Sequence, residues 1–206
     1  MLQALYIPFP QWITDFDLAV DNFIHLNWTN SVLDPIFTFI THLGDKGILW
    51  IAIALILLCF KKTRKIGIVM GIALVLGALF GNITLKNIFE RPRPFATEGA
   101  LLDAPYLIPH PSEFSFPSGH TTSSFAAAFG IFLYNKKWGI PALVMAALIA
   151  FSRLYVYVHF LTDVLVGTLL GIGCAILAYY LWNKWLEKIA VRIWNKLFKN
   201  HTIEHF

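Results

Sequence analysis

The stretch TDVLVGTLLGIGCAILAYYLW, residues 162–182, carries one charged residue, Asp163, and this lies at its start. A helix that crosses the hydrocarbon core of a bilayer needs about 20 mostly apolar residues, and this stretch supplies them. Four further apolar runs have the same character: residues 47–60, 66–89, 117–134 and 138–158. The run 47–60 is long enough only if its helix starts near Leu43 or tilts. The sequence therefore predicts about five membrane-spanning helices.

The composition of the whole chain agrees with this interpretation. Of its 206 residues, 57% are hydrophobic and 14% are charged. A typical soluble domain is about 45–50% apolar and about 25% charged. These values exclude an ordinary soluble enzyme, a disordered chain and a nucleic-acid-binding module. We expect an all-α, multi-spanning membrane bundle that forms one domain over residues 1–206, with residues 46–182 as its transmembrane core.

Both ends of the chain differ from this core. Between Leu18 and Leu43, polar residues interrupt the apolar stretches, which favours short interfacial helices anchored by Trp12 and Trp28, with a sixth span as the alternative. Residues 1–45 are therefore predicted as an interfacial region. Residues 183–206 form a basic tail whose apolar residues recur at helical spacing, and this indicates an amphipathic helix suited to an anionic membrane surface.

The net charge of +4 is unevenly distributed. If five spans alternate sides, one side of the membrane receives eleven of the sixteen Lys and Arg residues, from the runs 61–65 and 136–137 and from the tail. Basic loops stay in the cytoplasm, so this side is predicted to be cytoplasmic and the protein is expected in the cytoplasmic (inner) membrane. The opposite ends of the spans then face the extracytoplasmic side.

Three polar clusters fall at these predicted outer ends. They are the stretch KNIFERPRP (86–94), the stretch FPSGH (116–120), and Ser152-Arg153 followed by His159 and Asp163. Ionisable residues at the ends of spans are costly and commonly functional. The predicted topology brings the three clusters to one membrane face, although dozens of residues separate them in the chain.

The second cluster fits the start of a helix that binds an oxyanion. Pro117 suits the first helical position, and Ser118, Gly119 and His120 would then present backbone N–H groups at the positive end of the helix. A routine loop-to-helix junction would have the same appearance, because Pro-Ser-Gly is common at turns.

The other two clusters supply a histidine, a carboxylate and several cations. His159 and Asp163 are four residues apart, so on a helix the carboxylate could hold one imidazole nitrogen and leave the other as a nucleophile or base. A structural His–Asp hydrogen bond explains the same spacing. Lys86 and Arg153 suit phosphate binding, as does one of Arg91 and Arg93, and interfacial snorkelling is the alternative for each.

In this order, KNIFERPRP, PSGH and SRLYVYVHFLTD resemble the three signature motifs of the type 2 phosphatidic acid phosphatase (PAP2) superfamily, the lipid phosphate phosphatases. The resemblance covers Lys86 to Asp163 and places Arg93, not Arg91, in the motif, which leaves Arg91 as a solvated charge. It implies a phosphohistidine mechanism in which His159 attacks phosphorus, Asp163 orients it, and His120 protonates the leaving oxygen. The phosphoryl oxygens would be held by Lys86, Arg93, Ser118, Gly119 and Arg153.

The resemblance also implies a metal-independent enzyme without a cofactor. Cys59 and Cys174 lie in separate apolar runs with no zinc-binding spacing. The expected partners are the bilayer and a lipid phosphate, with undecaprenyl pyrophosphate favoured over phosphatidylglycerophosphate, phosphatidic acid and lipid A phosphates. A non-catalytic protein that binds anionic lipids remains the alternative from a different class, and a transporter is a third. Glu113, Asp103 and the oligomeric state stay unassigned.

Overall fold

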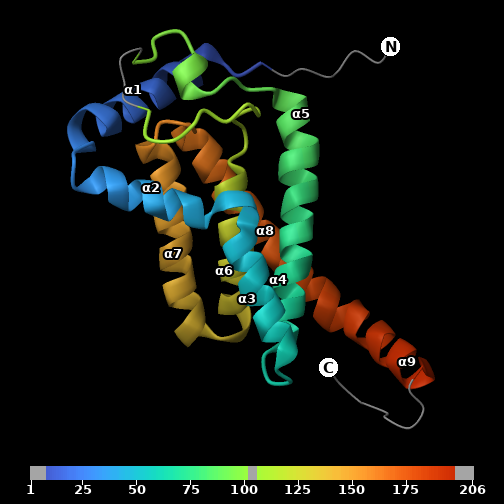
Figure 1. The fold of residues 1–206 in the computed structure, drawn as a ribbon. Helices are drawn as coiled ribbons and strands as arrows, with labels where there is room; N and C mark the ends of the chain where they lie inside the picture. Colours follow the sequence, from blue (N-terminus) through green and yellow to red (C-terminus); the bar gives the residue numbers. More distant parts are fainter. Residues whose placement is uncertain (1–7, 102–105, 198–206) are drawn as a thin grey trace.

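A computed structural model describes residues 8–101 and 106–197, and this part of the chain is helical without any strand (Figure 1). Asp103 lies outside it. The helices are α1 (Gln11–Trp28), α2 (Leu33–Leu43), α3 (Ile48–Cys59), α4 (Arg64–Gly77), α5 (Lys86–Phe89), α6 (Gly119–Tyr134), α7 (Lys136–Tyr155), α8 (Leu161–Leu181) and α9 (Glu187–Leu197). Short 3-10 or π-helical segments join several of them: η1 (Asp45–Gly47), η2 (Ala78–Leu85), η3 (Pro94–Ala96) and η4 (Trp182–Leu186).

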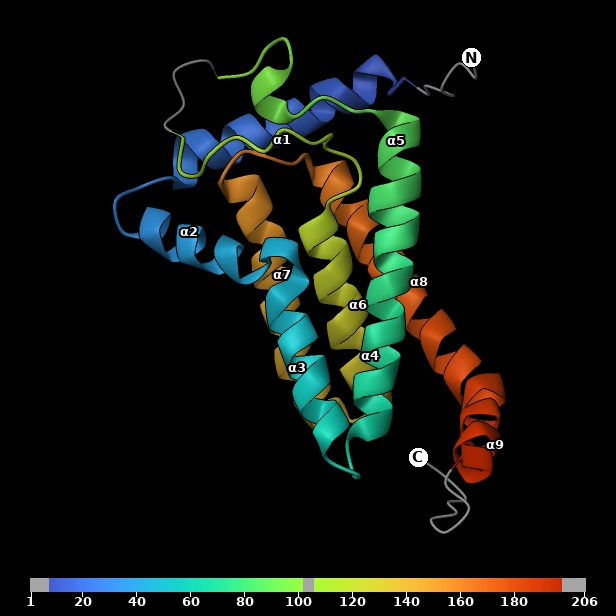
Figure 2. The same ribbon diagram turned by 45° about the vertical axis from the view of Figure 1, so that its right-hand side comes forward.

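The helix α6 forms the centre of the bundle and packs against α4, α7 and α8 (Figure 2). Small side chains make this close approach possible: Ala126, Ala127 and Ala128 of α6 are completely buried. A Cβ atom added at Gly171 of α8 would lie 2.5 Å from the backbone oxygen of Thr122 in α6. Small residues at helix contacts are the usual means of packing in a membrane, where association depends on close van der Waals contact.

Three helical stretches are long and apolar enough to cross a membrane: residues 64–96, 136–155 and 161–197. The pair α2 and α3 reaches the same length and hydropathy only together, across a bend of 42° at η1. The helix α6 has 16 residues and α3 has 12, so each is shorter than a typical span. The chain is thus an all-helical membrane protein with three to four spans by length and composition, and the five-span arrangement stays a prediction.

The helices α1 and α2 lie across the upper end of the bundle instead of running along it (Figures 1 and 2). The inner face of α1 buries Asp17, Asp21 and His25, whereas Trp12 and Phe23 point outward. These polar residues therefore face the protein, together with Leu18 and Ile24, whereas several large apolar side chains of α1 face the surroundings. Exposed apolar side chains of this kind are typical of a helix in contact with lipid.

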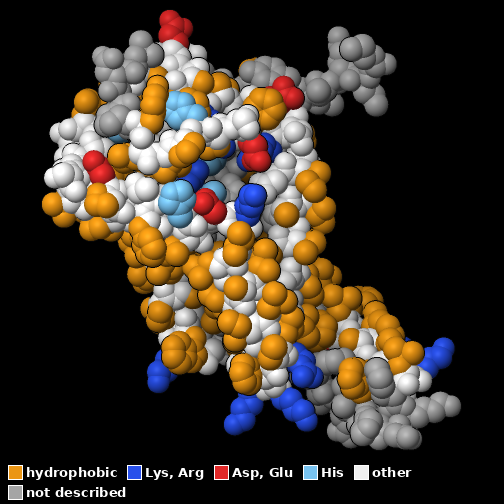
Figure 3. All heavy atoms as spheres, viewed as in Figure 1, with side chains coloured by type: hydrophobic (Ala, Val, Ile, Leu, Met, Phe, Trp, Pro, Cys, Tyr) orange, Lys and Arg blue, Asp and Glu red, His pale blue; other side chains and the backbone are white. Residues whose placement is uncertain are grey.

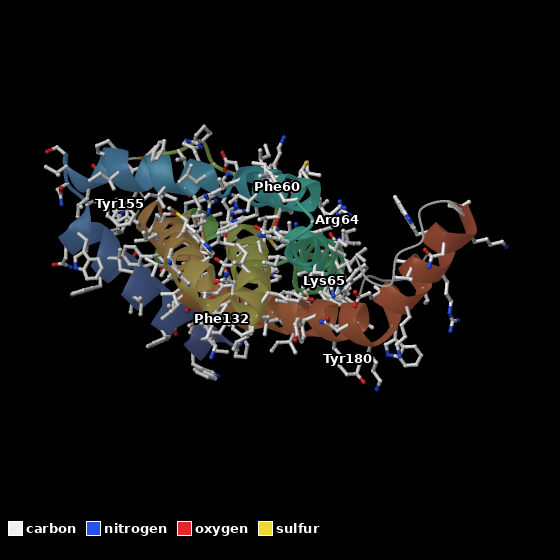
Figure 4. The ribbon with its side chains drawn as sticks, turned by 90° about the horizontal axis from the view of Figure 1, so that it is seen from below. Phe60, Arg64, Lys65, Phe132, Tyr155 and Tyr180 are labelled. Carbon is white, nitrogen blue, oxygen red and sulfur yellow. The ribbon has the colours of Figure 1, made fainter. Side chains whose placement is uncertain are left out.

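The lower end of the bundle carries most of the exposed cations (Figure 3). Figure 4 views this end from below, with Arg64 and Lys65 at the start of α4. Lys65 forms an ion pair of 2.8 Å with Glu187, which ties α4 to the first turn of α9. In α9, Ile189, Ile193 and Leu197 are exposed. The part of the predicted basic tail that the structure describes, residues 183–197, is thus helical and continues α8 through the π-helical segment η4, whereas residues 198–206 lie outside the described residues.

Two helix boundaries differ from those that the sequence predicts. Pro117 lies before α6, because Ser118 is the N-cap and its hydroxyl accepts the N–H of Thr121. The helix α7 ends at Tyr155, and a left-handed residue, Tyr157 with φ 59°, turns the chain before α8. His159 therefore lies in a tight loop and not on the helix that carries Asp163.

Candidate active site

A cavity of about 930 Å³ opens beneath the transverse helices at the upper end of the bundle. Figure 3 shows it as a hollow around which histidine, acidic and basic side chains gather. Of the eight predicted site residues, six line it: Lys86, Arg93, Gly119, His120, Arg153 and His159. Ser118 and Asp163 are completely buried and lie behind these. The fold thus brings the three sequence clusters together at one end of the bundle.

The same cavity continues as an apolar trough between α3 and α4. Its walls are Ile51, Leu55 and Leu58 on α3, with Leu74 and Val75 on α4. The approach of the two helices is close at Gly67, where an added Cβ would lie 2.7 Å from the backbone oxygen of Ala54. A ligand with a charged head and a long apolar chain would match the two parts of this cavity.

His159 is held by contacts on both ring nitrogens. Its Nδ1 lies 3.3 Å from the Ser115 hydroxyl and 3.4 Å from a carboxylate oxygen of Asp163, and its Nε2 lies 3.3 Å from the Arg93 guanidinium. Burial lowers the pKa of His159 well below its ordinary value, and the nearby Arg93 cation lowers it further. The imidazole is therefore neutral at pH 7, with a lone pair available on one nitrogen.

Asp163 reaches His159 because of its place in the first turn of α8. Its carboxylate accepts the backbone N–H of Phe160 at 2.9 Å, which caps the helix, and it also accepts the hydroxyl of Ser115. The predicted proximity of His159 and Asp163 is present, but its cause is this capping contact and not a shared helical face. The sequence patterns gave no indication of Ser115.

Arg91 is buried and not solvated, which corrects the expectation from its motif register. Its exposed fraction is 2%. Its guanidinium donates to Asp163 at 2.7 Å and to Asp17 of α1 at 2.7 Å. The rings of Phe9 and Phe160 lie 4.1 and 3.9 Å from its Cζ. Arg91 therefore braces the carboxylate behind the histidine from the side opposite the cavity.

The three other cations surround the cavity. Arg93 donates to the backbone oxygens of Glu113 and Val158, both at 2.7 Å. Lys86 pairs with the Glu113 carboxylate at 2.9 Å, and this hydrogen bond lowers the pKa of Glu113. Arg153, 2% exposed, donates to the hydroxyl of Thr41 in α2. Backbone contacts thus fix Arg93. Lys86 is instead paired with a side chain, which a bound anion could replace.

The start of α6 contributes backbone to the cavity at Gly119. A Cβ atom there would lie 2.8 Å from the side-chain oxygen of Asn82 in the π-helical segment η2, so a larger residue would have to displace that side chain. The hydroxyl of Ser118 accepts from the Thr121 hydroxyl at 3.0 Å. Unpaired N–H groups at such a helix start attract anions.

His120 has a partner that the sequence patterns did not reveal. Its Nε2 lies 2.9 Å from a carboxylate oxygen of Asp45, and the other oxygen of Asp45 lies 2.8 Å from Nδ1 of His42. The separation of Asp45 and His120 by 75 residues explains why spacing could not identify the pair. Within residues 8–101 and 106–197, no three His, Cys, Asp or Glu side chains are grouped closely enough to hold a metal ion.

These features define a multi-pass helical membrane protein with a cationic, histidine-containing site at one end. A family model described as the PAP2 superfamily matches residues 64–187, and the chain belongs to this family of phosphatases. It is 32% identical to an undecaprenyl-diphosphatase of Sulfolobus acidocaldarius, over 83% of this chain and 82% of the relative. It is also 32% identical to the undecaprenyl-diphosphatase BcrC of Bacillus subtilis, over 88% of this chain and 94% of the relative.

A solved structure supports the same assignment. The crystal structure of a PAP2-type phosphatidylglycerolphosphate phosphatase from Bacillus subtilis superposes with a TM-score of 0.69 at 29% identity. The superposition covers 85% of this chain and 89% of the other. The fold and the family are therefore established together, and the resemblance of the three motifs is confirmed.

The positions of the two tandem arginines lead to a test of their separate roles. Replacing Arg91 with Ala leaves Asp17 and Asp163 as unpaired buried carboxylates, which costs about 3–5 kcal/mol of folding free energy. Arg93→Ala removes a cavity cation whose partners are neutral backbone oxygens. We expect a large fall in the midpoint of thermal unfolding for Arg91→Ala and a small one for Arg93→Ala, while both variants lose phosphatase activity. Equal midpoints in detergent would contradict the bracing role of Arg91.

Proposed function

We propose that this protein hydrolyses the pyrophosphate of a polyprenyl lipid, undecaprenyl pyrophosphate, through a phosphohistidine intermediate. The observation that carries the proposal is the two-part cavity, with cations, His120 and His159 at one end and an apolar trough at the other. The trough suits a long hydrocarbon chain and the cations suit phosphate oxygens. Two relatives that cover most of the chain are undecaprenyl-diphosphatases by name, and this favours the same substrate.

His159 is proposed as the nucleophile. Its Nδ1–H is directed toward the Ser115 hydroxyl and the Asp163 carboxylate, so the lone pair lies on Nε2. Attack of Nε2 on the terminal phosphorus forms the N–P bond and breaks the bond to the leaving oxygen. The Asp163 carboxylate stabilises the positive charge that the imidazole gains in this step, as buried carboxylates do beside other histidines.

The proposed phosphate ligands are Lys86, Arg93 and Arg153, with Ser118 and Gly119 at the start of α6. Phosphoryl transfer depends mainly on positioning and charge neutralisation, which these donor groups around one phosphate would supply. Lys86 can exchange its Glu113 partner for phosphate, because that partner is a side chain of the loop before α6. Glu113 would then pair with Lys86 only when the site holds no substrate.

His120 is proposed to act on the other side of the phosphorus. In the first step it gives a proton to the leaving oxygen. In the second it removes a proton from water, the resulting hydroxide attacks phosphorus, and the N–P bond to His159 breaks. The products are the lipid monophosphate and inorganic phosphate, and the enzyme returns to its starting state. With charge neutralised by side chains, we expect the reaction to need no divalent metal or cofactor.

Phosphatidylglycerophosphate is the second candidate substrate, favoured by the solved Bacillus subtilis phosphatase with a TM-score of 0.69. Phosphatidic acid would enter the same cavity. A non-catalytic protein that binds anionic lipids would need the cations but not a neutral, buried His159 held against a carboxylate. The presence of that pair in the cavity favours catalysis over binding alone.

We also propose that residues 1–206 form one membrane-embedded domain. Residues 1–45 would lie at the interface, residues 46–182 would cross the bilayer, and residues 183–206 would form the basic tail. The cavity would open on the extracytoplasmic side of the cytoplasmic membrane. The charge distribution supports this orientation. The exposed Lys61 and Lys62 lie in the turn between α3 and α4, and the exposed Lys136 and Lys137 lie at the start of α7, so all four are at the end of the bundle away from the cavity (Figure 1).

The activity itself is tested by phosphate release from undecaprenyl pyrophosphate, phosphatidylglycerophosphate and phosphatidic acid, using purified protein in detergent with excess chelator. We expect release with undecaprenyl pyrophosphate as the fastest substrate. His159→Ala should abolish it because the nucleophile is gone. Lys86→Ala should lower it by about 10²-fold or more, as loss of one transition-state donor does, whereas Lys137→Ala, an exposed lysine at the far end, should retain it.

Three results would contradict the proposal. No release from any of the lipids would exclude the phosphatase activity proposed for this site. Wild-type turnover by a folded His159→Ala protein would exclude the phosphohistidine step. Loss of activity in chelator with recovery on addition of magnesium would exclude the metal-independent mechanism.

The orientation is tested by labelling single cysteines in intact cells with a membrane-impermeant thiol reagent, after Cys59 and Cys174 are replaced. Glu98 lies exposed beside the cavity end, and Lys137 lies exposed at the opposite end. Glu98→Cys should be labelled in intact cells, and Lys137→Cys only after the membrane is permeabilised. The reverse pattern would place the site on the cytoplasmic side and leave its chemistry unaffected.

A further inference from the structure

The break between α2 and α3 places a carboxylate against His120. In η1, Lys46 and Gly47 have φ values of 51° and 68°, so two successive residues adopt the left-handed conformation. This turns the chain by 42° between the two helices. Asp45, at the start of the turn, reaches into the cavity and lies 2.9 Å from Nε2 of His120. A non-glycine residue such as Lys46 rarely adopts this conformation, and strain of this kind is commonly retained at functional sites.

The backbone beside Asp45 is also fitted to the imidazole. A Cβ atom at Gly44 would lie 2.6 Å from Cδ2 of His120 and 2.7 Å from Cγ2 of Ile149. Any other residue at position 44 would therefore displace the ring or the α7 side chain. The close approach of this backbone and the carboxylate that follows it fix the imidazole from two directions.

Asp45 connects His120 to the solvent through a second histidine. Its other carboxylate oxygen lies 2.8 Å from Nδ1 of His42, in the last turn of α2. The side chains become more exposed along this series, from 20% for His120 to 48% for Asp45 and 53% for His42. Hydrogen-bonded side chains thus lead from the phosphate site to the surface.

We propose that Asp45 is a positioning residue that holds His120 in the correct orientation and protonation state for its two proton transfers, with His42 fixing the outer oxygen of Asp45. This inference rests on the proposed function, in which His120 is the acid and base. Because Nε2 donates to Asp45, Nδ1 is the nitrogen that serves the substrate. A proton passes from Nδ1 to the leaving oxygen, and Nδ1 later takes one from water. Throughout, the other proton remains on Nε2, which donates it in the hydrogen bond to Asp45.

The surrounding charges show why such a partner is needed. Arg153 from α7, Arg93 from the loop after α5 and Lys86 line the same cavity as His120, and their positive charges oppose a further positive charge on the ring. Glu113 is the other carboxylate near the ring, and it is paired with Lys86. Asp45 therefore supplies the negative charge that stabilises protonated His120 until bound phosphate neutralises the cations.

The same contacts could serve only to hold η1 against α6. The dependence of the rate on the leaving group distinguishes this structural role from a role in proton transfer. Phenolate, from an acid of pKa about 10, needs a proton as it leaves. The 4-nitrophenolate ion is much more stable and leaves without one. A defect in proton donation therefore slows phenyl phosphate far more than 4-nitrophenyl phosphate, whereas a general distortion slows both equally.

The experiment measures kcat/KM for these two soluble esters with the full-length protein in detergent, because kcat/KM reports the steps up to loss of the phenol and excludes the attack of water that both esters share. For Asp45→Asn we expect a loss of about 10²-fold or more with phenyl phosphate, the usual contribution of a general acid. The loss with 4-nitrophenyl phosphate should be less than about tenfold. Asp45→Glu should recover part of the difference. The exposed Asp15, whose partner is Gln11 on the same helix, provides a control, and Asp15→Asn should leave both rates unchanged.

His42→Gln provides a second variant at a more exposed position. It should slow phenyl phosphate more than 4-nitrophenyl phosphate, as Asp45→Asn does, but to a smaller extent. Equal losses for both esters in Asp45→Asn would overturn the proposal. If Asp45→Asn does not fold, an unchanged ratio of the two rates in His42→Gln would overturn it. Failure of the proposed function has a different signature, because wild-type protein would then release phosphate from neither lipids nor aryl esters.

Discussion

The buried guanidinium of Arg91 is the interaction on which the site depends. It joins Asp17 of α1 to Asp163 of α8 with two bonds of 2.7 Å and lies between two aromatic rings. Without this cation the two buried carboxylates would lose their counter-charge, at a cost of several kcal/mol, on the order of that for a broken buried ion pair. The transverse helix, the loop after α5 and the start of α8 are thereby fixed to one another.

The ion pairs of Arg91 with Asp17 and Asp163 determine the positions of the other site residues. Asp163, held by Arg91 and Ser115, caps the first turn of α8 and keeps its second oxygen beside His159. The neighbouring Arg93 is free of carboxylate partners and bonds to backbone oxygens instead, so its charge is directed at the cavity. Two arginines separated by one proline thus occupy opposite sides of His159, the proposed nucleophile: Arg91 lies behind it and Arg93 lies on the cavity side.

The sequence was sufficient to identify the motif residues, because helix ends at one membrane face converge whatever the details of packing. It was insufficient for Asp45 and Ser115, whose contacts with His120 and Asp163 depend on loop conformation. Arg91 was mistaken for a solvated charge because Asp17, its partner, lies 74 residues away in a segment without a motif. His159 was expected on a helix, and the left-handed turn at Tyr157 could not be inferred from a tyrosine.

The most direct test of the central claim is to capture the phosphorylated enzyme. Protein is mixed with undecaprenyl pyrophosphate, quenched within its first turnover under alkaline denaturing conditions that preserve phosphohistidine, and digested for mass spectrometry. The account predicts one phosphoryl group, located on His159, and none in a folded His159→Ala protein. A phosphoryl group on another residue, or active protein that never carries one, would contradict it.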